Sequence, residues 1–177
     1  MQLQKQHAFA ANDIQSITCT VPPLVNRLVG RPLIDNMDPN YAKLCLGFVA
    51  GVYLKHGWVD IPHFLGSELI DTDVLAAAAK VSVVQDNNPD LNALNPQHIA
   101  VTLQSGQLLE ITLDSVYGDP EKPLSKDENI EKFTRCCSRS KNPFTEKQQD
   151  DIITFCETLE SQNDVASLIP AMSLGTS

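Results

Sequence analysis

The chain has 177 residues, of which 42% are hydrophobic and 20% are charged, values typical of one globular domain of ordinary size. Its net charge of −9 argues against nucleic acid or an anionic membrane as a partner. Five cysteines without a CxxC pair favour reduced thiols in a cytoplasmic protein over a disulfide scaffold.

The N-terminal region predicts a short helix followed by a strand. Residues 1–11 are polar with a single lysine, so we expect no signal peptide and interpret them as the end of a helix. In residues 14–21, hydrophobic side chains alternate with Ser and Thr, which is the pattern of a half-buried strand. Pro22 and Pro23 end this strand, and residues 24–36 predict a loop or a short helix.

Residues 38–57 predict one continuous helix around which the rest of the chain is organised. Asp38 suits the N-cap, Pro39 the first helical position, and Gly57 the left-handed residue after the last turn. The side chains between them are apolar almost all round, so we expect burial on most sides. Lys43 and several small residues interrupt the hydrophobicity, which favours a core helix over a membrane span.

The region after this helix predicts a short helical turn, a helix and a strand. The turn covers residues 59–66 and is expected to be anchored by Trp58, Ile61, Phe64 and Leu65. Either Thr72 or Asp71 can cap a helix over residues 74–80. Residues 81–84 form the next predicted strand, and a polar loop follows.

Two alternating strands, residues 99–103 and 109–113, predict a hairpin with a defined register. A two-residue turn would place their apolar faces on opposite sides of the sheet, since a one-residue slip exchanges the faces of a strand. We therefore predict a three-residue turn at 104–106, with its glycine left-handed, which pairs Val101 with Leu109.

The C-terminal region carries two capping boxes, Ser125 with Glu128 and Thr145 with Gln148, each of which predicts the start of a helix. Residues 173–177 are expected to fray. The whole pattern predicts an α+β fold: a small antiparallel sheet of about four strands packed on the buried central helix, followed by C-terminal helices.

The motifs that would indicate a cofactor or a metal are absent from the sequence. It contains no GxGxxG, Walker A, GxSxG or HExxH pattern, and the four histidines are scattered, so we expect no cofactor and no metal. His56 with His63 is at most a weak pair of ligands.

Two groups of residues could carry chemistry. Residues 1–57 hold five basic against three acidic side chains, and a basic region around Arg27, Arg31 and Lys43 could receive a carboxylate; the alternative is that these are solvated surface charges. The thiols of Cys136 and Cys137 lie beside two arginines that could lower a thiol pKa; the alternative is a pair of ordinary, half-exposed cysteines.

Several stretches resemble, in order, the C-terminal part of the MmgE/PrpD family of 2-methylcitrate dehydratases and cis-aconitate decarboxylases. The similarity covers about nine-tenths of the chain and rests on the order and spacing of short motifs. These are an IxxIxxxVP strand at 14–22, a GRP element at 30–32, an AKxS-like helix at 42–45, a VDxxHF-like turn at 59–64 and a VTLxSG hairpin at 101–106.

The resemblance implies a fold and a missing partner. Residues 1–124 would be an α+β lid-like domain, and residues 125–177 would be C-terminal helices that pack on a large N-terminal helical domain. Because that domain is missing here, we expect the chain to be a fragment or a separated domain, with the helical domain as partner and homodimerisation left open. Nucleic acid and membrane are not expected partners.

The resemblance also implies an activity. The family carries out cofactor-free elimination or decarboxylation of small di- and tricarboxylates, including 2-methylcitrate in propionate metabolism. Arg31 and Lys43 would be substrate-binding residues that contact carboxylates of the substrate. Cys45 stands where the family usually has Ser, and Gly47-Phe48 where it has Pro-Tyr, so a hydroxyl and a phenol are missing. We expect no activity from the chain alone.

Two other functions are alternatives to the interpretation as part of a lyase. The first is a non-catalytic binding or interaction module that kept the fold and lost the chemistry. The second is a thiol-dependent protein that uses Cys136 or Cys137.

Overall fold

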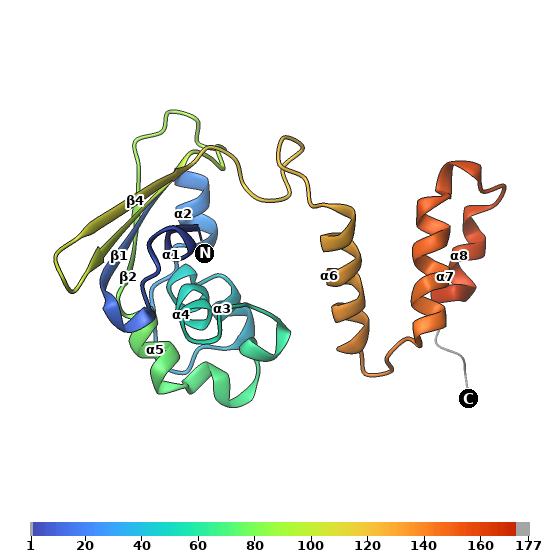
Figure 1. Ribbon diagram of the computed structural model, residues 1–177, viewed down its shortest axis with the longest axis horizontal. Helices are drawn as coiled ribbons and strands as arrows, with labels where there is room; N and C mark the ends of the chain where they lie inside the picture. Colours follow the sequence, from blue (N-terminus) through green and yellow to red (C-terminus); the bar gives the residue numbers. More distant parts are fainter. Residues whose placement is uncertain (1, 173–177) are drawn as a thin grey trace. The chain divides into compact units, whose positions relative to one another are not determined.

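The computed structural model describes residues 2–172, and the chain forms two compact units. The first unit runs to Lys122 and the second begins at Pro123 (Figure 1). The fraying expected at residues 173–177 lies outside the described residues.

The first unit contains a four-stranded mixed sheet, which confirms the α+β class and the number of strands. The strand order is β2-β1-β3-β4, and the strands are β1 (Ile14–Val21), β2 (Val81–Gln85), β3 (Gln97–Leu103) and β4 (Leu108–Leu113). The β1–β3 and β3–β4 pairs are antiparallel, but β1 and β2 are parallel. The prediction of an antiparallel sheet is therefore wrong for this pair. Because the helices between β1 and β2 return the chain to the same end of the sheet, the two strands run in one direction.

The β3–β4 hairpin has the predicted register. Val101 pairs with Leu109 and Ile99 with Ile111. The turn is closed by hydrogen bonds from Leu103 N–H to the Gln107 carbonyl and from Gly106 N–H to the Leu103 carbonyl, both 2.9 Å long. Gly106 has φ +85°, the left-handed conformation that this turn requires.

One face of the sheet forms one of the two hydrophobic clusters of the first unit; the other lies around the helix α4 (Leu46–His56). Side chains of β1, β3 and β4 pack on this face of the sheet with side chains of the helices α1 (Gln2–His7), α2 (Pro23–Val29) and α4; a 3-10 turn, η1 (Ala11–Asp13), joins α1 to the sheet. The buried residues of this cluster are Leu3, Ile14, Ile17, Cys19, Val21, Val25, Val101, Leu103 and Leu109. Ile14 shares the face of Ile17, in spite of the odd spacing, because the pairing with β3 shifts by one residue between Ile14 and Ser16.

The predicted central helix is two helices, so the prediction of one continuous helix is wrong. Its ends are correct: Asp38 accepts hydrogen bonds from two N–H groups of the first turn of α3 (Pro39–Lys43), and Gly57 after α4 has φ +78°. Between the two helices, Cys45 has extended backbone angles (φ −102°, ψ 96°) and forms an isolated β-bridge with Gly30. There the Cys45 N–H donates a 3.1 Å hydrogen bond to the Ala42 carbonyl, three residues back. The bridge to Gly30 is a long-range contact, which leaves no local pattern in the sequence.

The helix α4 is buried against α5 (Thr72–Ala78), which Asp71 rather than Thr72 caps. Phe48 and Val52 of α4 are completely inaccessible to solvent. At Gly51, a Cβ atom would lie 2.5 Å from the Val74 carbonyl oxygen of α5, so the two helix backbones approach more closely than a side chain would permit.

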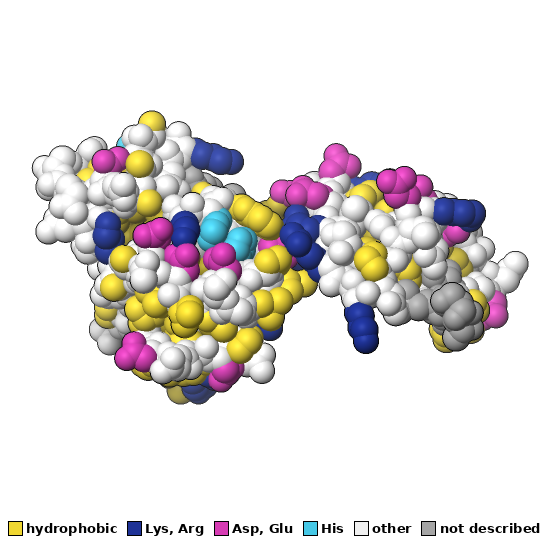
Figure 2. Space-filling view, turned by 90° about the horizontal axis from the view of Figure 1, so that it is seen from below, with side chains coloured by type: hydrophobic (Ala, Val, Ile, Leu, Met, Phe, Trp, Pro, Cys, Tyr) yellow, Lys and Arg dark blue, Asp and Glu magenta, His cyan; other side chains and the backbone are white. Residues whose placement is uncertain are grey.

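The segment after α4 forms two 3-10 turns, η2 (Ile61–Phe64) and η3 (Gly66–Ile70). Of the four predicted anchors only Phe64 is buried; the side chains of Trp58, Ile61 and Leu65 are exposed, so the prediction is wrong for these three. His63 is buried in their place, because its ring accepts a hydrogen bond from the backbone and therefore loses little on leaving water. Hydrophobic side chains gather near histidines and acidic groups on the face shown in Figure 2.

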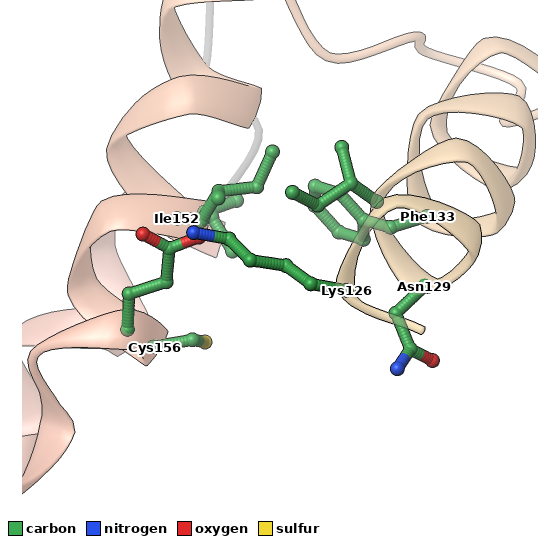
Figure 3. A pocket seen from close by; sticks show the side chains of 8 residues that line it. Lys126, Asn129, Phe133, Ile152 and Cys156 are labelled. Carbon is green, nitrogen blue, oxygen red and sulfur yellow. The ribbon is translucent and has the colours of Figure 1, made fainter. Parts of the chain in front are cut away.

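The second unit is helical. It consists of α6 (Lys126–Ser138), α7 (Glu146–Glu157), the 3-10 turns η4 (Leu159–Ser161) and η5 (Val165–Ser167), and α8 (Leu168–Met172). Both predicted capping boxes are present at the starts of α6 and α7. Apolar residues of α6 and α7, among them Phe133 and Ile152, line a groove of about 420 Å³, and Lys126 forms a 2.7 Å ion pair with Glu157 beside it (Figure 3).

None of the helices within residues 2–172 has both the length and the apolar character that a membrane crossing would require.

Candidate carboxylate-binding site

A pocket of about 270 Å³ in the first unit contains one of the two predicted binding residues. It lies between the loop after α2, the break between α3 and α4, and the connection from α5 to β2. Its lining residues are Gly30, Arg31, Pro32, Leu33, Cys45, Gly47, Ala78, Val81, Ser82 and Val83.

Backbone contacts hold the Arg31 loop in place. Gly30 follows α2 and forms the β-bridge with Cys45, which ties the loop to the break between α3 and α4. A side chain at Gly30 would put its Cβ 2.5 Å from the Asn26 carbonyl oxygen, so the close approach requires glycine. On the other side, the Tyr41 hydroxyl donates a 2.9 Å hydrogen bond to the Pro32 carbonyl.

The Arg31 guanidinium is oriented by the Tyr41 ring. Its central carbon lies 5.2 Å from the ring centroid, a distance at which a cation is attracted by the aromatic face. Across the described part of the chain, Arg31 has no carboxylate within 4 Å. An exposed guanidinium with this orientation and no acidic partner can donate two parallel hydrogen bonds to a carboxylate.

Lys43 lies at the end of α3 with an exposed side chain and is not among the residues that line the pocket. The structure therefore places Arg31 at the pocket without placing Lys43 there. The role of Lys43 as a second carboxylate contact stays a prediction.

The pocket contains residues that the sequence did not indicate. Ser82 of β2 offers a hydroxyl, and Ala78 of α5 forms part of the wall. They reach the site because α5 and β2 pack next to α4, and no short motif signals such a contact. The buried Cys45 thiol, 1% exposed, stands at the position where the family resemblance expects a Ser.

The chemistry available in this pocket is limited to binding. Among the residues that the structure describes, none that lines it carries a carboxylate or an imidazole. Abstraction of a proton from a carbon acid requires a base within hydrogen-bond reach of that proton. As it stands, the pocket can hold an anionic group but does not include the base for an elimination.

The cysteine pair of α6 tests the alternative of a reactive thiol beside two arginines, and Cys137 does not support it. This side chain is buried, and burial, with a smaller effect of Cys136, raises the pKa of its thiol. Of the two alternatives that the sequence left open, a lowered thiol pKa does not hold for Cys137, because loss of solvent disfavours the charged thiolate. In β1, burial raises the pKa of the Cys19 thiol to about 11.

These pKa values predict an order of alkylation rates. With iodoacetamide at pH 7.5, Cys19 and Cys137 are expected to react at least tenfold more slowly than the exposed Cys136 and Cys156, because the thiolate is the reactive form. Peptide mapping by mass spectrometry measures each rate, and urea-unfolded protein serves as the control in which the rates converge. Equal rates in the native protein would contradict the burial of these thiols.

Comparison with known proteins identifies the family. Residues 1–160 match the family of MmgE/PrpD C-terminal domains. The chain belongs to the MmgE/PrpD family. This confirms the resemblance seen in the short motifs, and the matched range includes the whole Arg31 pocket.

Two curated relatives within this MmgE/PrpD similarity are the cis-aconitate decarboxylases of Mus musculus and Homo sapiens. Each is 27% identical to this chain over 162 residues, which is 90% of this chain. The aligned region is 32% of the mouse protein and 33% of the human protein. The chain thus spans about a third of the length of the curated relatives it matches.

Proposed function

We propose that this chain is the C-terminal part of an MmgE/PrpD-like lyase and that its Arg31 pocket binds one carboxylate of a small di- or tricarboxylate. The observation that carries the proposal is an arginine without an acidic partner, held over a tyrosine ring at the edge of a pocket within the family match. A volume of about 270 Å³ suits a small acid better than a large cofactor. Lys43 would contact a second carboxylate of the substrate.

The missing chemistry defines the partner in this proposal. Since the pocket lacks a base, the proton acceptor and the acid for the leaving group would come from an N-terminal helical domain that completes the site. The same domain would cover the apolar groove between α6 and α7. The reaction would be an elimination such as 2-methylcitrate dehydration, in propionate metabolism, or a decarboxylation as in the named relatives. Five free thiols support a cytoplasmic location.

A second candidate function is a binding module without catalysis. The replacement of the expected Ser by Cys45, and the absence of acid and base groups from the pocket lining within the described residues, favour this alternative. It shares the carboxylate site with the lyase proposal and differs in needing no partner domain.

Calorimetric titration with citrate and with cis-aconitate tests the site. Arg31→Ala is expected to weaken binding about tenfold or more, because a hydrogen bond to a charged group contributes about 1.5–3 kcal/mol. Lys43→Ala is expected to weaken it by a smaller factor. Arg27→Ala is the matched control, since Arg27 is an exposed arginine on α2 that does not line the pocket.

Two results would overturn the proposal. Heats equal to those of dilution into buffer for the unmodified chain would remove the carboxylate site. Turnover of cis-aconitate by this chain alone would remove the requirement for a partner domain.

A further inference from the structure

The end of α4 and the turns η2 and η3 contain a cluster of aromatic and titratable side chains that the carboxylate pocket does not use. The His56 ring, in the last turn of α4, stacks on the His63 ring of η2 with 4.6 Å between centroids and 27° between planes. The Trp58 and His63 rings are T-shaped to each other, with 4.7 Å between centroids and 75° between planes. These residues lie outside the pocket lining, so the cluster is a separate feature of the first unit.

His63 is buried in a form that requires its ring to be neutral. Its side chain is 5% exposed, and its Nδ1 accepts a 3.0 Å hydrogen bond from the Asp60 N–H. A protonated imidazole has no acceptor, so a proton on Nδ1 removes this hydrogen bond. The same bond is half of the capping box that begins η2, whose other half is the Asp60 carboxylate. Protonation of His63 therefore acts directly on the start of the turn.

Charged groups face His63 from each element packed around it. His56 comes from α4, Glu68 from η3 and Asp60 from the N-cap of η2, while the nearby Lys55 is engaged by Asp71 and Asp73. Glu68 lies 3.1 Å from Nε2 of His56. Two adjacent imidazolium rings repel each other, so a charged His56 opposes protonation of His63.

The pKa of His63 has a defined direction. Burial, followed by the charge of His56, lowers it from the ordinary value of 6.5, and these two effects outweigh Glu68 and Asp60, which raise it. The unfolded chain consequently binds more protons than the folded chain below about pH 6.5. The stabilising effect of neutral His63 is complete above this pH and is lost as the pH falls through the lower, folded-state pKa.

We propose that the stacked His56–His63 pair is a pH-sensitive switch, which holds η2 and η3 against the end of α4 at neutral pH and releases them in mildly acidic solution. Release would expose Phe64, whose side chain is buried in the structure. The ring centroids of Phe64 and Phe48 lie 6.0 Å apart. It would also increase the mobility of the exposed apolar side chains in this segment, which are Trp58, Ile61, Leu65 and Ile70.

Trp58 is a probe of this cluster, because it is the only tryptophan of the chain and touches His63. Its emission is measured from pH 8 to pH 4.5, and hydrogen exchange of residues 58–70 is followed by mass spectrometry at the same pH values, corrected for the intrinsic exchange rate. We expect a reversible change in emission with a midpoint below 6.5 and faster exchange in this segment, but not in the β3–β4 hairpin.

Three variants distinguish the source of the change. His63→Gln is expected to abolish the transition, and His56→Gln to shift its midpoint to higher pH, since it removes the neighbouring charge. His98→Gln is the control: this histidine pairs with Glu110 on the sheet and should leave the midpoint unchanged. If His63→Gln does not fold, the shift of the pH midpoint in His56→Gln tests the proposal by itself.

The proposal is overturned by an emission that stays constant to pH 4.5, or by an unchanged midpoint in both His63→Gln and His56→Gln. A change in emission with constant exchange of residues 58–70 would also overturn it, because Trp58 would then report the proton without any release. None of these measurements uses a carboxylate ligand, so they are independent of the function proposed for the Arg31 pocket.

Discussion

Phe48→Ala is expected to destabilise the first unit by about 3–5 kcal/mol, the range found when a buried Phe is reduced to Ala. Phe48 is completely inaccessible to solvent and packs on Phe64. It also belongs to the second hydrophobic cluster of this unit, which joins α3, α4, η2 and α5. Its removal leaves a cavity beside α4. Cys45, just before α4, is bridged to Gly30 of the Arg31 loop, so the same elements also position that loop.

Urea unfolding followed by Trp58 emission measures this change in the first unit alone, because the second unit contains no tryptophan. Leu91→Ala is a suitable control, since Leu91 is 64% exposed in the loop before β3 and should change the free energy of unfolding by about 0.5 kcal/mol or less. A cost below about 1 kcal/mol for Phe48→Ala would show that α4 is not the centre of the core.

Gly51→Ala is expected to destabilise the same unit by about 1–3 kcal/mol, although Ala is ordinarily better than Gly in a helix by about 1 kcal/mol. The added Cβ would lie 2.5 Å from the Val74 carbonyl oxygen and 2.9 Å from the Ala78 backbone nitrogen. Both atoms belong to the backbone of α5, so no side-chain rotation relieves the overlap. The helices α4 and α5 would have to move apart.

Gly47→Ala provides the matched control, because Gly47 is another buried glycine of α4, one turn earlier. There the nearest atom, the Ala78 carbonyl oxygen, would lie 3.5 Å from the new Cβ, an ordinary contact. We expect this variant to keep its stability or to gain up to about 1 kcal/mol. Thermal unfolding of both variants, monitored by Trp58 emission, gives the comparison. Equal melting temperatures for Gly47→Ala and Gly51→Ala would refute the close contact between α4 and α5.

The candidate site was predictable only in part. Arg31 could be selected from the sequence because it lies in a GRP element within a family pattern. The other side of the pocket could not, because Ser82 lies about fifty residues further along and comes to the pocket only when β2 pairs with β1. The same holds for His63, which the sequence suggested only as half of a weak metal pair. Its burial depends on contacts with His56 and Trp58 in the folded chain.

The sequence by itself determined the features whose cause is local. The caps at Asp38 and Gly57, the strand at residues 14–21 and the turn at 104–106 each depend on side chains within a few residues, and the structure agrees at all four. Their energetics are decided by neighbours along the chain.

Only the tertiary structure decided the features whose cause lies far away in sequence. The break in the central helix lies where Cys45 forms a bridge with Gly30, and the parallel pairing of β1 with β2 requires the helices between them to cross over. The raised pKa of Cys19 requires a core to form around it. Each of these depends on the contacts and the solvent exclusion that packing creates, and a pattern of neighbouring residues does not contain that information.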